Sequence, residues 1–287
     1  MKKAADLSRK GRASFASGRC VRGTYVPSDQ AKEITRSVSF TKPSRVLARF
    51  SVDRGFDNKN TMLRGFSFRI GSAGQHSEIF TQNAPVHFAR TVDQMFAYLQ
   101  AHFARPDGKP DVEKISLFSA ANPETLNQAN YIAAHPPAES FASTTYWGVH
   151  AFPATNAKGE TRFIKFRIDP VGEQAIGPKG KIRLRPAELL NDELESRISA
   201  REVRFSVMAL LDRQGDPVMD VTVRWPDEDH REPVRLGTIV ITGVEANEAC
   251  DDAGFSPATL AEGIGYPPDE IFAARRATYT LSQKMRP

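Results

Sequence analysis

Short segments in which apolar and polar residues alternate recur along most of this chain. Alternation with a period of two places the apolar side chains on one face of a β-strand, so each segment predicts a half-buried strand. These segments are residues 20–26, 45–52, 64–70, 79–88, 146–154, 161–168, 203–211, 218–225 and 234–242. Asn83-Ala84-Pro85 interrupts one of them, and the pattern as a whole predicts roughly eight strands.

Turn residues predict that most of these strands pair with their neighbours in an antiparallel way. The first three strands are expected to form a meander. Residues 156–159 (Asn-Ala-Lys-Gly) and 213–217 (Arg-Gln-Gly-Asp-Pro) each have the composition of a hairpin turn. We therefore expect the strands before and after each of these turns to lie side by side.

Helical spacing of apolar residues replaces alternation at 92–103, 123–134 and 187–200, and again near the C-terminus. The second of these helices begins at Pro123, a residue that suits the first turn. The combined pattern predicts an α+β fold, an antiparallel eight-stranded β-barrel with inserted and C-terminal helices. With 287 residues, 40% of them hydrophobic, the chain is expected to form a single domain over residues 1–287.

Composition narrows the functional classes. No apolar run is long enough to span a bilayer, which predicts a cytoplasmic protein without a membrane partner. The net charge is +5, but the arginines are scattered, so we expect no nucleic-acid partner and assign the basic charge to carboxylates of a cofactor or substrate. Cys20 and Cys250 lack a CxxC or Cys/His pattern and are expected to be buried or incidental thiols.

The C-terminal segment places three polar side chains on one helix face. Tyr279 and Arg286 follow Arg275 by four and eleven residues, which puts all three within a stripe roughly 40° wide. A guanidinium one turn away favours the ionised form of a phenol, and a phenolate is a good ligand for ferric iron. Taken alone, the same pattern also fits an amphipathic helix with a core tyrosine.

Several motifs together resemble the haem catalases. They occur in the family's order and at plausible spacing, and they span the chain from about Arg12 to Arg286. These motifs are residues 12–25, Arg49-Phe50-Ser51, Asn83-Ala84-Pro85-Val86, Gly263-Ile264, Asp269 and the run from Arg275 to Arg286. The coverage is similar to that of the small catalase-related peroxidase branch, without the long N-terminal arm that threads between subunits in larger catalases. A homo-oligomer is expected, and its tetrameric form is left open.

The resemblance implies a haem b cofactor and a role for each matched residue. Tyr279 would be the axial ligand of the haem iron, and Arg275 its charge partner. Three arginines would contact the haem propionates, and two further residues would lie beside the haem. These are Arg12, Arg49 and Arg286 for the propionates, with Phe96 and His150 beside the haem.

The distal side departs from the family's pattern. Phe15 stands where the family has its catalytic histidine, and a benzyl ring cannot take a proton from peroxide or return one. Ser51 and Asn83 remain to orient an oxygen ligand. Asp53 replaces a channel valine, and its carboxylate is either a displaced acid-base group or a turn aspartate facing solvent. Phe15 is either an introduced substitution or native to a divergent branch.

With these residues, the resemblance implies a haem peroxidase or catalase that uses hydrogen peroxide or organic hydroperoxides, with dismutation impaired at Phe15. A small organic co-substrate is a further expected partner. One alternative is a divergent haem enzyme that performs peroxygenation or hydroperoxide rearrangement. Another alternative is a non-catalytic haem carrier or sensor.

Overall fold

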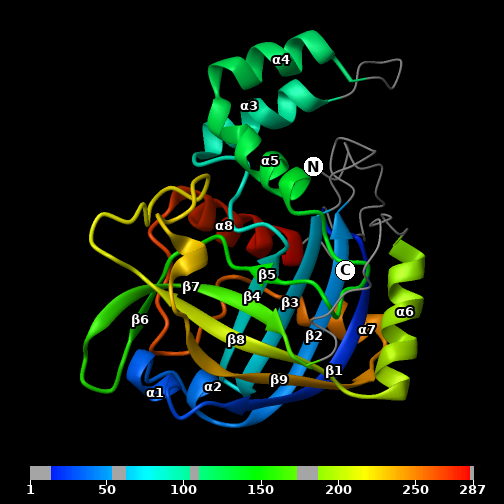
Figure 1. The fold of residues 1–287 in the computed structure, drawn as a ribbon, viewed down its shortest axis with the longest axis vertical. Helices are drawn as coiled ribbons and strands as arrows, with labels where there is room; N and C mark the ends of the chain where they lie inside the picture. The colour runs from blue at the N-terminus through cyan, green and yellow to red at the C-terminus, as the bar shows by residue number, and fades with distance from the viewer. Residues whose placement is uncertain (1–13, 54–62, 104–109, 173–186, 285–287) are drawn as a thin grey trace.

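A closed antiparallel β-barrel forms the centre of the molecule (Figure 1). The computed structural model describes residues 14–53, 63–103, 110–172 and 187–284. Around the barrel the strands follow the order β5-β4-β3-β2-β1-β9-β8-β7, and β7 pairs with β5 to close the ring. Of the described strands, β7 is the one that pairs with β6, and Ala154 of β6 also forms an isolated bridge with Ile264. The strands are β1 (Ser17–Pro27), β2 (Ser44–Asp53), β3 (Leu63–Ser72), β4 (Gln75–Gln82), β5 (Tyr146–Trp147), β6 (Phe152–Thr155), β7 (Thr161–Pro170), β8 (Val203–Leu211) and β9 (Val234–Val244).

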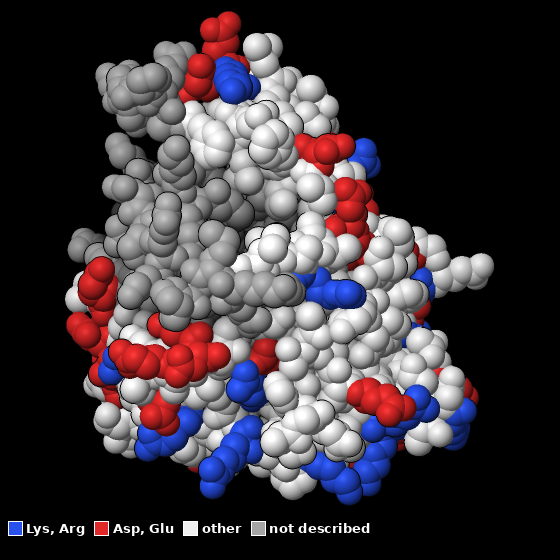
Figure 2. Space-filling model, turned by 180° about the vertical axis from the view of Figure 1, so that it is seen from behind, with Lys and Arg blue, Asp and Glu red and all other residues white. Residues whose placement is uncertain are grey.

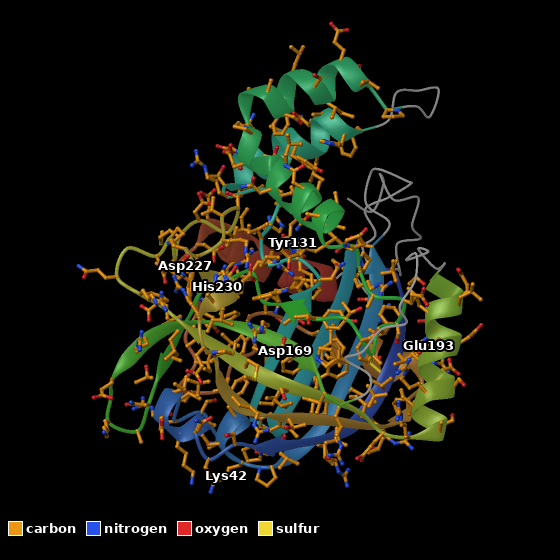
Figure 3. The ribbon with its side chains drawn as sticks, in the orientation of Figure 1. Lys42, Tyr131, Asp169, Glu193, Asp227 and His230 are labelled. Atoms are coloured by element: carbon orange, nitrogen blue, oxygen red, sulfur yellow. A yellow bond between two sulfur atoms is a disulfide. The ribbon has the colours of Figure 1, made fainter. Side chains whose placement is uncertain are left out.

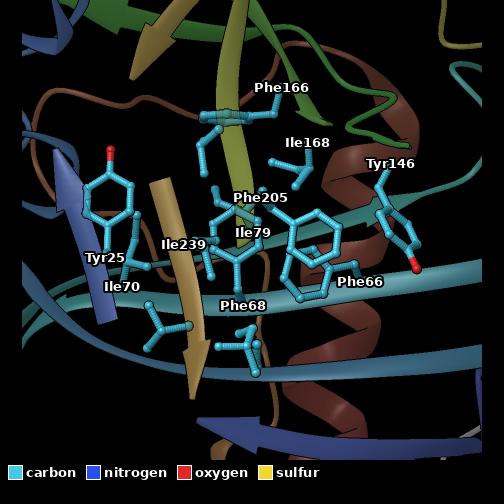
Figure 4. Packing of buried hydrophobic residues seen from close by; sticks show 14 of the residues in the cluster. Tyr25, Phe66, Phe68, Ile70, Ile79, Tyr146, Phe166, Ile168, Phe205 and Ile239 are labelled. Carbon is cyan, nitrogen blue, oxygen red and sulfur yellow. The ribbon is translucent and has the colours of Figure 1, made fainter. Parts of the chain in front are cut away.

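Aromatic side chains fill the barrel (Figure 4). The Phe50 and Phe66 rings stack with centroids 4.5 Å apart, and Tyr146 and Phe205 pack beside them. Each fully buried phenylalanine contributes about 3 kcal/mol to folding. Since side chains alternate along a strand, the inward direction of Phe50 turns its neighbours on β2 outward.

Helices cover the barrel on several sides. α3 (Val92–His102), α4 (Val112–Ala121) and α5 (Asn127–Ala134) gather above one end of the barrel, and α8 (Glu270–Lys284) runs behind it (Figure 1). α6 (Ala187–Ala200) flanks β1 and β9, while α7 (Asn247–Ala253) packs on β1 and β2. The remaining short helices are α1 (Ala31–Ile34), α2 (Val38–Thr41), η1 (Pro123–Leu126) and η3 (Glu228–His230). None of the described helices is long and apolar enough to cross a membrane.

The expected barrel with inserted and C-terminal helices is confirmed, but the second predicted hairpin is wrong. Residues 218–225 form turns and bends instead of a strand. Their main chain finds other partners: Val221 accepts a hydrogen bond from the His87 N–H (2.7 Å), and Thr222 accepts one from Asn127 Nδ2 (2.9 Å). Both edges of β8 are already occupied by β7 and β9. The segment therefore has no strand edge to join.

The prediction for the cysteines is also wrong. Cys20 on β1 and Cys250 on α7 form a disulfide across 230 residues of sequence. Their sulfurs lie in a small apolar cluster with Phe255, against Leu47 of β2. The fold, and not the local spacing, brings the two residues together.

The outer surface carries both signs of charge. Figure 2 shows acidic and basic side chains on the rear face, next to broad uncharged areas. On the flank, Glu193 of α6, labelled in Figure 3, accepts a hydrogen bond from Ser140 Oγ (2.7 Å). Ser140 in turn accepts, through its carbonyl, a hydrogen bond from the buried Arg64 guanidinium (3.0 Å). This chain of contacts ties α6 to the mouth of the barrel.

Candidate active site

Local sequence explains where α8 begins and how it presents Tyr279. Pro267 and Pro268 disfavour continuation of a helix, and Asp269 then caps the new one, because its Oδ1 accepts the Phe272 N–H at 2.8 Å. Arg275 and Tyr279 follow on the same helix, one turn apart, and the Tyr279 side chain is half-buried. The predicted pair is therefore on a helix, at the predicted spacing. Arg286 lies outside the described residues.

A buried polar network joins α8 to the segment after β5. His150 Nδ1 lies 2.9 Å from Asp269 Oδ2, and Arg275 Nη1 donates toward His150 Nε2 at 3.2 Å. Burial and the nearby Arg275 charge lower the pKa of His150, although Asp269 opposes that shift. Burial raises the pKa of Asp269, but the hydrogen bond and charge of His150, the Phe272 N–H and the Arg275 charge together outweigh it, so that the pKa is lowered overall. The network is thus a neutral imidazole between a carboxylate and a guanidinium.

A second buried histidine, His87, lies near this network, and sequence reasoning did not single it out. Burial, with a smaller contribution from Arg275, lowers the pKa of His87 to about 3. Its Nδ1 lies 2.9 Å from the carbonyl of Ala89, and its ring stacks on Phe88. Its position directly after Asn83-Ala84-Pro85-Val86 was the available signal. His87 stays uncharged at neutral pH.

Because side chains alternate along a strand, only some residues of β2 and β3 face the expected distal side. Ser51 of β2 pairs with Gly65 of β3, and both alternate with the inward phenylalanines, so they face outside the barrel. A Cβ placed on Gly65 would lie 2.8 Å from Ser51 Oγ and 2.9 Å from Phe15 Cδ1. Only glycine leaves room there for the Phe15 ring beside the serine hydroxyl.

Two polar side chains hold the Phe15 segment in place. Arg49 donates from Nη1 to the Phe15 carbonyl and from Nη2 to the Ala16 carbonyl, both at 2.8 Å. On the other side, the Phe15 N–H donates to Asp53 Oδ2 at 3.4 Å. Phe15 itself has a φ of 53°, a left-handed conformation that is uncommon for a residue with a Cβ. Arg49 and Asp53 hold the main chain in that conformation.

Asn83 leaves one hydrogen-bond donor unused. Its Oδ1 accepts the Arg64 N–H at 2.8 Å, which fixes the direction of the amide. Its Nδ2 is buried, and none of the described groups accepts a hydrogen bond from it. An unsatisfied buried donor costs about 1–3 kcal/mol, so such a group calls for a bound acceptor.

Phe80 of β4 links the two sides of the site. The Phe15 ring meets the Phe80 ring edge-on, with centroids 5.0 Å apart, and the Arg275 guanidinium lies 4.7 Å from the centroid of the same ring. The residues expected on the distal and proximal sides of a haem thus converge on one aromatic residue. Sequence reasoning did not identify Phe80, since nothing in the alternating pattern distinguishes it.

Two expected haem contacts are not part of this cluster of contacts. Phe96 lies on α3 with 59% of its side chain exposed. Arg12 lies outside the described residues.

The donor set nevertheless fits a ferric haem. Tyr279 carries a phenol oxygen that could ligate iron, with Arg275 one turn away on the same helix, and the buried Asn83 Nδ2, which has no described acceptor, could donate to a bound oxygen.

Comparisons with known proteins point to one family. A family model described as Catalase matches residues 10–287. The chain is 29% identical to a catalase-related peroxidase of Synechococcus elongatus, over 96% of this chain and 83% of that protein. It is 26% identical to a catalase-related peroxidase of Mycolicibacterium paratuberculosis, over 96% of this chain and 88% of that protein.

Solved structures give the same fold. A bacterial catalase superimposes with a TM-score of 0.81 at 19% identity, and catalase A from Saccharomyces cerevisiae with a TM-score of 0.80 at 19% identity. Each comparison covers 96% of this chain but only 57% and 61% of the solved chains. The chain therefore spans less than two thirds of the length of these catalases.

Proposed function

This chain belongs to the catalase family, and from that premise we propose that it is a haem-dependent peroxidase of the catalase type in which Phe15 limits dismutation of hydrogen peroxide. Family membership and the similarity to catalase-related peroxidases make it an oxidoreductase that acts on peroxide. The proposal adds hydrogen peroxide and organic hydroperoxides as its substrates. The observation that carries it is the buried Nδ2 of Asn83, for which none of the described groups accepts a hydrogen bond.

The haem in this proposal is haem b, and bound haem supplies the two electrons that cleave a peroxide O–O bond. Tyr279 would hold its iron, and Arg275 would favour the phenolate by its positive charge. We propose Arg12, Arg49 and Arg286 as propionate contacts, because the planar guanidinium matches a carboxylate bidentately. Phe96 and His150 would lie against the macrocycle.

The proposed distal residues differ in what each can do for a bound peroxide. Ser51 Oγ and Asn83 Nδ2 can each hydrogen-bond a peroxide oxygen and fix its orientation. Phe15 can do neither this nor proton transfer, and a positioned acid-base group is worth roughly 100 to 10,000-fold in rate. The expected consequence is slow conversion of hydrogen peroxide.

A second candidate is oxygen transfer to, or rearrangement of, an organic hydroperoxide. The observation that favours it is the apolar wall made by the Phe15 and Phe80 rings, which lie edge-on at 5.0 Å. Such a wall suits a hydrocarbon chain better than hydrogen peroxide. A non-catalytic haem carrier is the third reading, and turnover of any co-substrate separates it from the two enzymes.

Spectroscopy of the purified protein tests the proposal. The haem-loaded protein should show a ferric, tyrosinate-ligated spectrum and should respond to hydrogen peroxide and to cumene hydroperoxide, with a phenol as co-substrate. Tyr279→Phe should abolish or badly weaken haem retention, because phenylalanine has no oxygen to donate. Tyr266→Phe is the matched control, since that hydroxyl contacts only the Ala258 carbonyl among the described groups. Full haem occupancy with an unchanged spectrum in Tyr279→Phe would show that another residue ligates the iron.

We also propose that residues 1–287 form one domain and that the protein is a homo-oligomer that uses a small organic co-substrate. A cytoplasmic location competes with the Cys20–Cys250 disulfide, because disulfides persist mainly in oxidising compartments.

A further inference from the structure

We propose that the carboxylate of Asp53 is the distal proton acceptor of this site. It takes the proton from a weak acid, such as a hydroperoxide or hydrogen cyanide, when the conjugate base binds over the haem. The inference rests on the proposed function and deepens it, because it gives the distal pocket the base that Phe15 does not supply.

Strand geometry places Asp53 on the face that carries the other distal residues. β2 ends at Asp53, and Arg49, Ser51 and Asp53 occupy alternate positions along it. Because alternate side chains of a strand share a face, all three point outside the barrel, opposite the inward Phe50. Asp53 is therefore the next outward side chain after the distal serine.

The contact with Phe15 places the Asp53 carboxylate beside the position at which the family has its histidine. Asp53 Oδ2 lies 3.4 Å from the Phe15 main-chain nitrogen, the residue that replaces the family's histidine. Arg49 contacts the Phe15 carbonyl, Phe80 contacts the Phe15 ring, and Ser51 Oγ flanks Gly65 together with that ring. Of these side chains and Asp53, Asp53 alone is a carboxylate that can accept a proton.

The chemistry needs only a proton transfer. The O–H bond of a hydroperoxide, or the H–C bond of hydrogen cyanide, breaks, and its electron pair stays on the oxygen or carbon that binds. The proton moves to an Asp53 carboxylate oxygen. Arg49, which faces the same segment, stays cationic and cannot take it. Asn83 Nδ2 and Ser51 Oγ then hydrogen-bond the bound anion.

The competing explanation is that Asp53 only supports the turn and the Phe15 main chain. Asp53→Asn separates the two, because the asparagine Oδ1 still accepts the Phe15 N–H while the amide cannot take up a proton. The structural contact is kept and the base is removed.

Cyanide binding to the ferric, haem-loaded protein provides a test that does not depend on turnover. Hydrogen cyanide must lose its proton to bind, so the association rate reports the distal base. We expect Asp53→Asn to lower that rate by about 100-fold or more, with the haem content, the melting temperature and the spectrum before cyanide unchanged. Asp29 is an exposed aspartate beyond the far end of β1, and the control variant Asp29→Asn should bind cyanide at the parent rate.

A double variant tests whether a slower cyanide rate in Asp53→Asn comes from damage to the pocket instead of loss of the base. Phe15→His with Asp53→Asn should bind cyanide at least as fast as the parent, because the imidazole replaces the missing base. Equal cyanide rates in the parent and Asp53→Asn would overturn the role of Asp53 while leaving the haem proposal intact. A slow double variant would overturn it too, since the loss would then come from the pocket and not from the base. A protein that takes up no haem would overturn both proposals.

Discussion

Replacing Phe15 by histidine should convert this protein into a faster consumer of hydrogen peroxide. The ring at this position and the Ser51 hydroxyl both flank Gly65: Phe15 Cδ1 and Ser51 Oγ lie 2.9 Å and 2.8 Å from the point that a Cβ on Gly65 would occupy. An imidazole in the same rotamer would put Nδ1 or Cδ2 where Cδ1 is now, beside that hydroxyl. Asn83 Nδ2 remains available to the peroxide oxygen.

The expected gain follows from the worth of a positioned acid-base group. Such groups contribute about 100 to 10,000-fold, which is about 3–5 kcal/mol of activation free energy. The change should cost little stability. Phe15 has a φ of 53°, and histidine occupies the left-handed region several-fold more often than most residues with a Cβ. The edge-on contact with Phe80 also suits an imidazole ring.

Oxygen release, measured with an electrode, and stopped-flow spectra of the haem after peroxide mixing are the assays. Phe80→His is the matched control, because it adds the same imidazole one ring away, 5.0 Å from Phe15. Phe80→His should not give the gain. Two results would refute the reasoning: a haem-replete Phe15→His no faster than the parent, or a parent that already dismutates peroxide rapidly. After the first result, Asp53→Val is the next variant to assay.

Substitutions at three other places test further parts of the structure. Arg49→Ala should weaken haem binding in a titration, and Arg49→Lys should recover only part of the affinity, because an ammonium lacks the planar fork of a guanidinium. Equal haem affinity in the parent and both variants would leave Arg49 only its contacts with the main chain. Since the pKa of His87 is about 3 in the folded protein and 6.5 for an unperturbed histidine, the unfolded chain binds more protons between these values. The free energy of unfolding should therefore fall by about 1.4 kcal/mol per unit as pH drops through that window. His87→Asn should flatten this slope in urea titrations, and an unchanged slope would assign it elsewhere. Cys20→Ala with Cys250→Ala should lower the free energy of unfolding by about 5 kcal/mol, because the disulfide closes a 230-residue loop; a guanidinium titration showing almost no loss would contradict that.

The barrel was predictable because its strands carry a local signal. Along β2 and β3 the inward phenylalanines alternate with small or polar residues, and that period of two is visible in the sequence. The start of α8 was equally readable, from the two prolines and the capping Asp269. These elements depend on neighbours in sequence.

The errors share a physical origin in contacts between distant residues. Residues 218–225 alternate like a strand, but His87 and Asn127 take up their carbonyls, so tertiary contacts override the local pattern. The two cysteines gave no local signal, and only the packing of α7 on β1 brings them within bonding distance. α4 was missed as well, because none of its side chains is buried and its apolar pattern is weak.

In the candidate site, too, the sequence suggested individual residues but not the contacts between residues far apart in the chain. Motif resemblance predicts Tyr279, Arg275, Ser51 and Asn83 as site residues, whereas contacts between residues distant in sequence could not be predicted from it. Phe80 is the clearest case, because it touches Phe15 on one side and Arg275 on the other. No spacing rule relates these three residues.

In the proposed site, a phenyl ring at position 15 would have two opposite effects on the distal pocket. It would leave the pocket without an imidazole as proton acceptor, and it would extend the apolar surface of Phe80. The polar groups that remain lie on the strands: Ser51 and Asp53 at the end of β2, and Asn83 directly after β4. An organic hydroperoxide can place its hydrocarbon on the rings and its peroxide group against these polar atoms. Hydrogen peroxide would gain nothing from the rings, so on the proposed function the same residue that slows dismutation would favour the larger substrate.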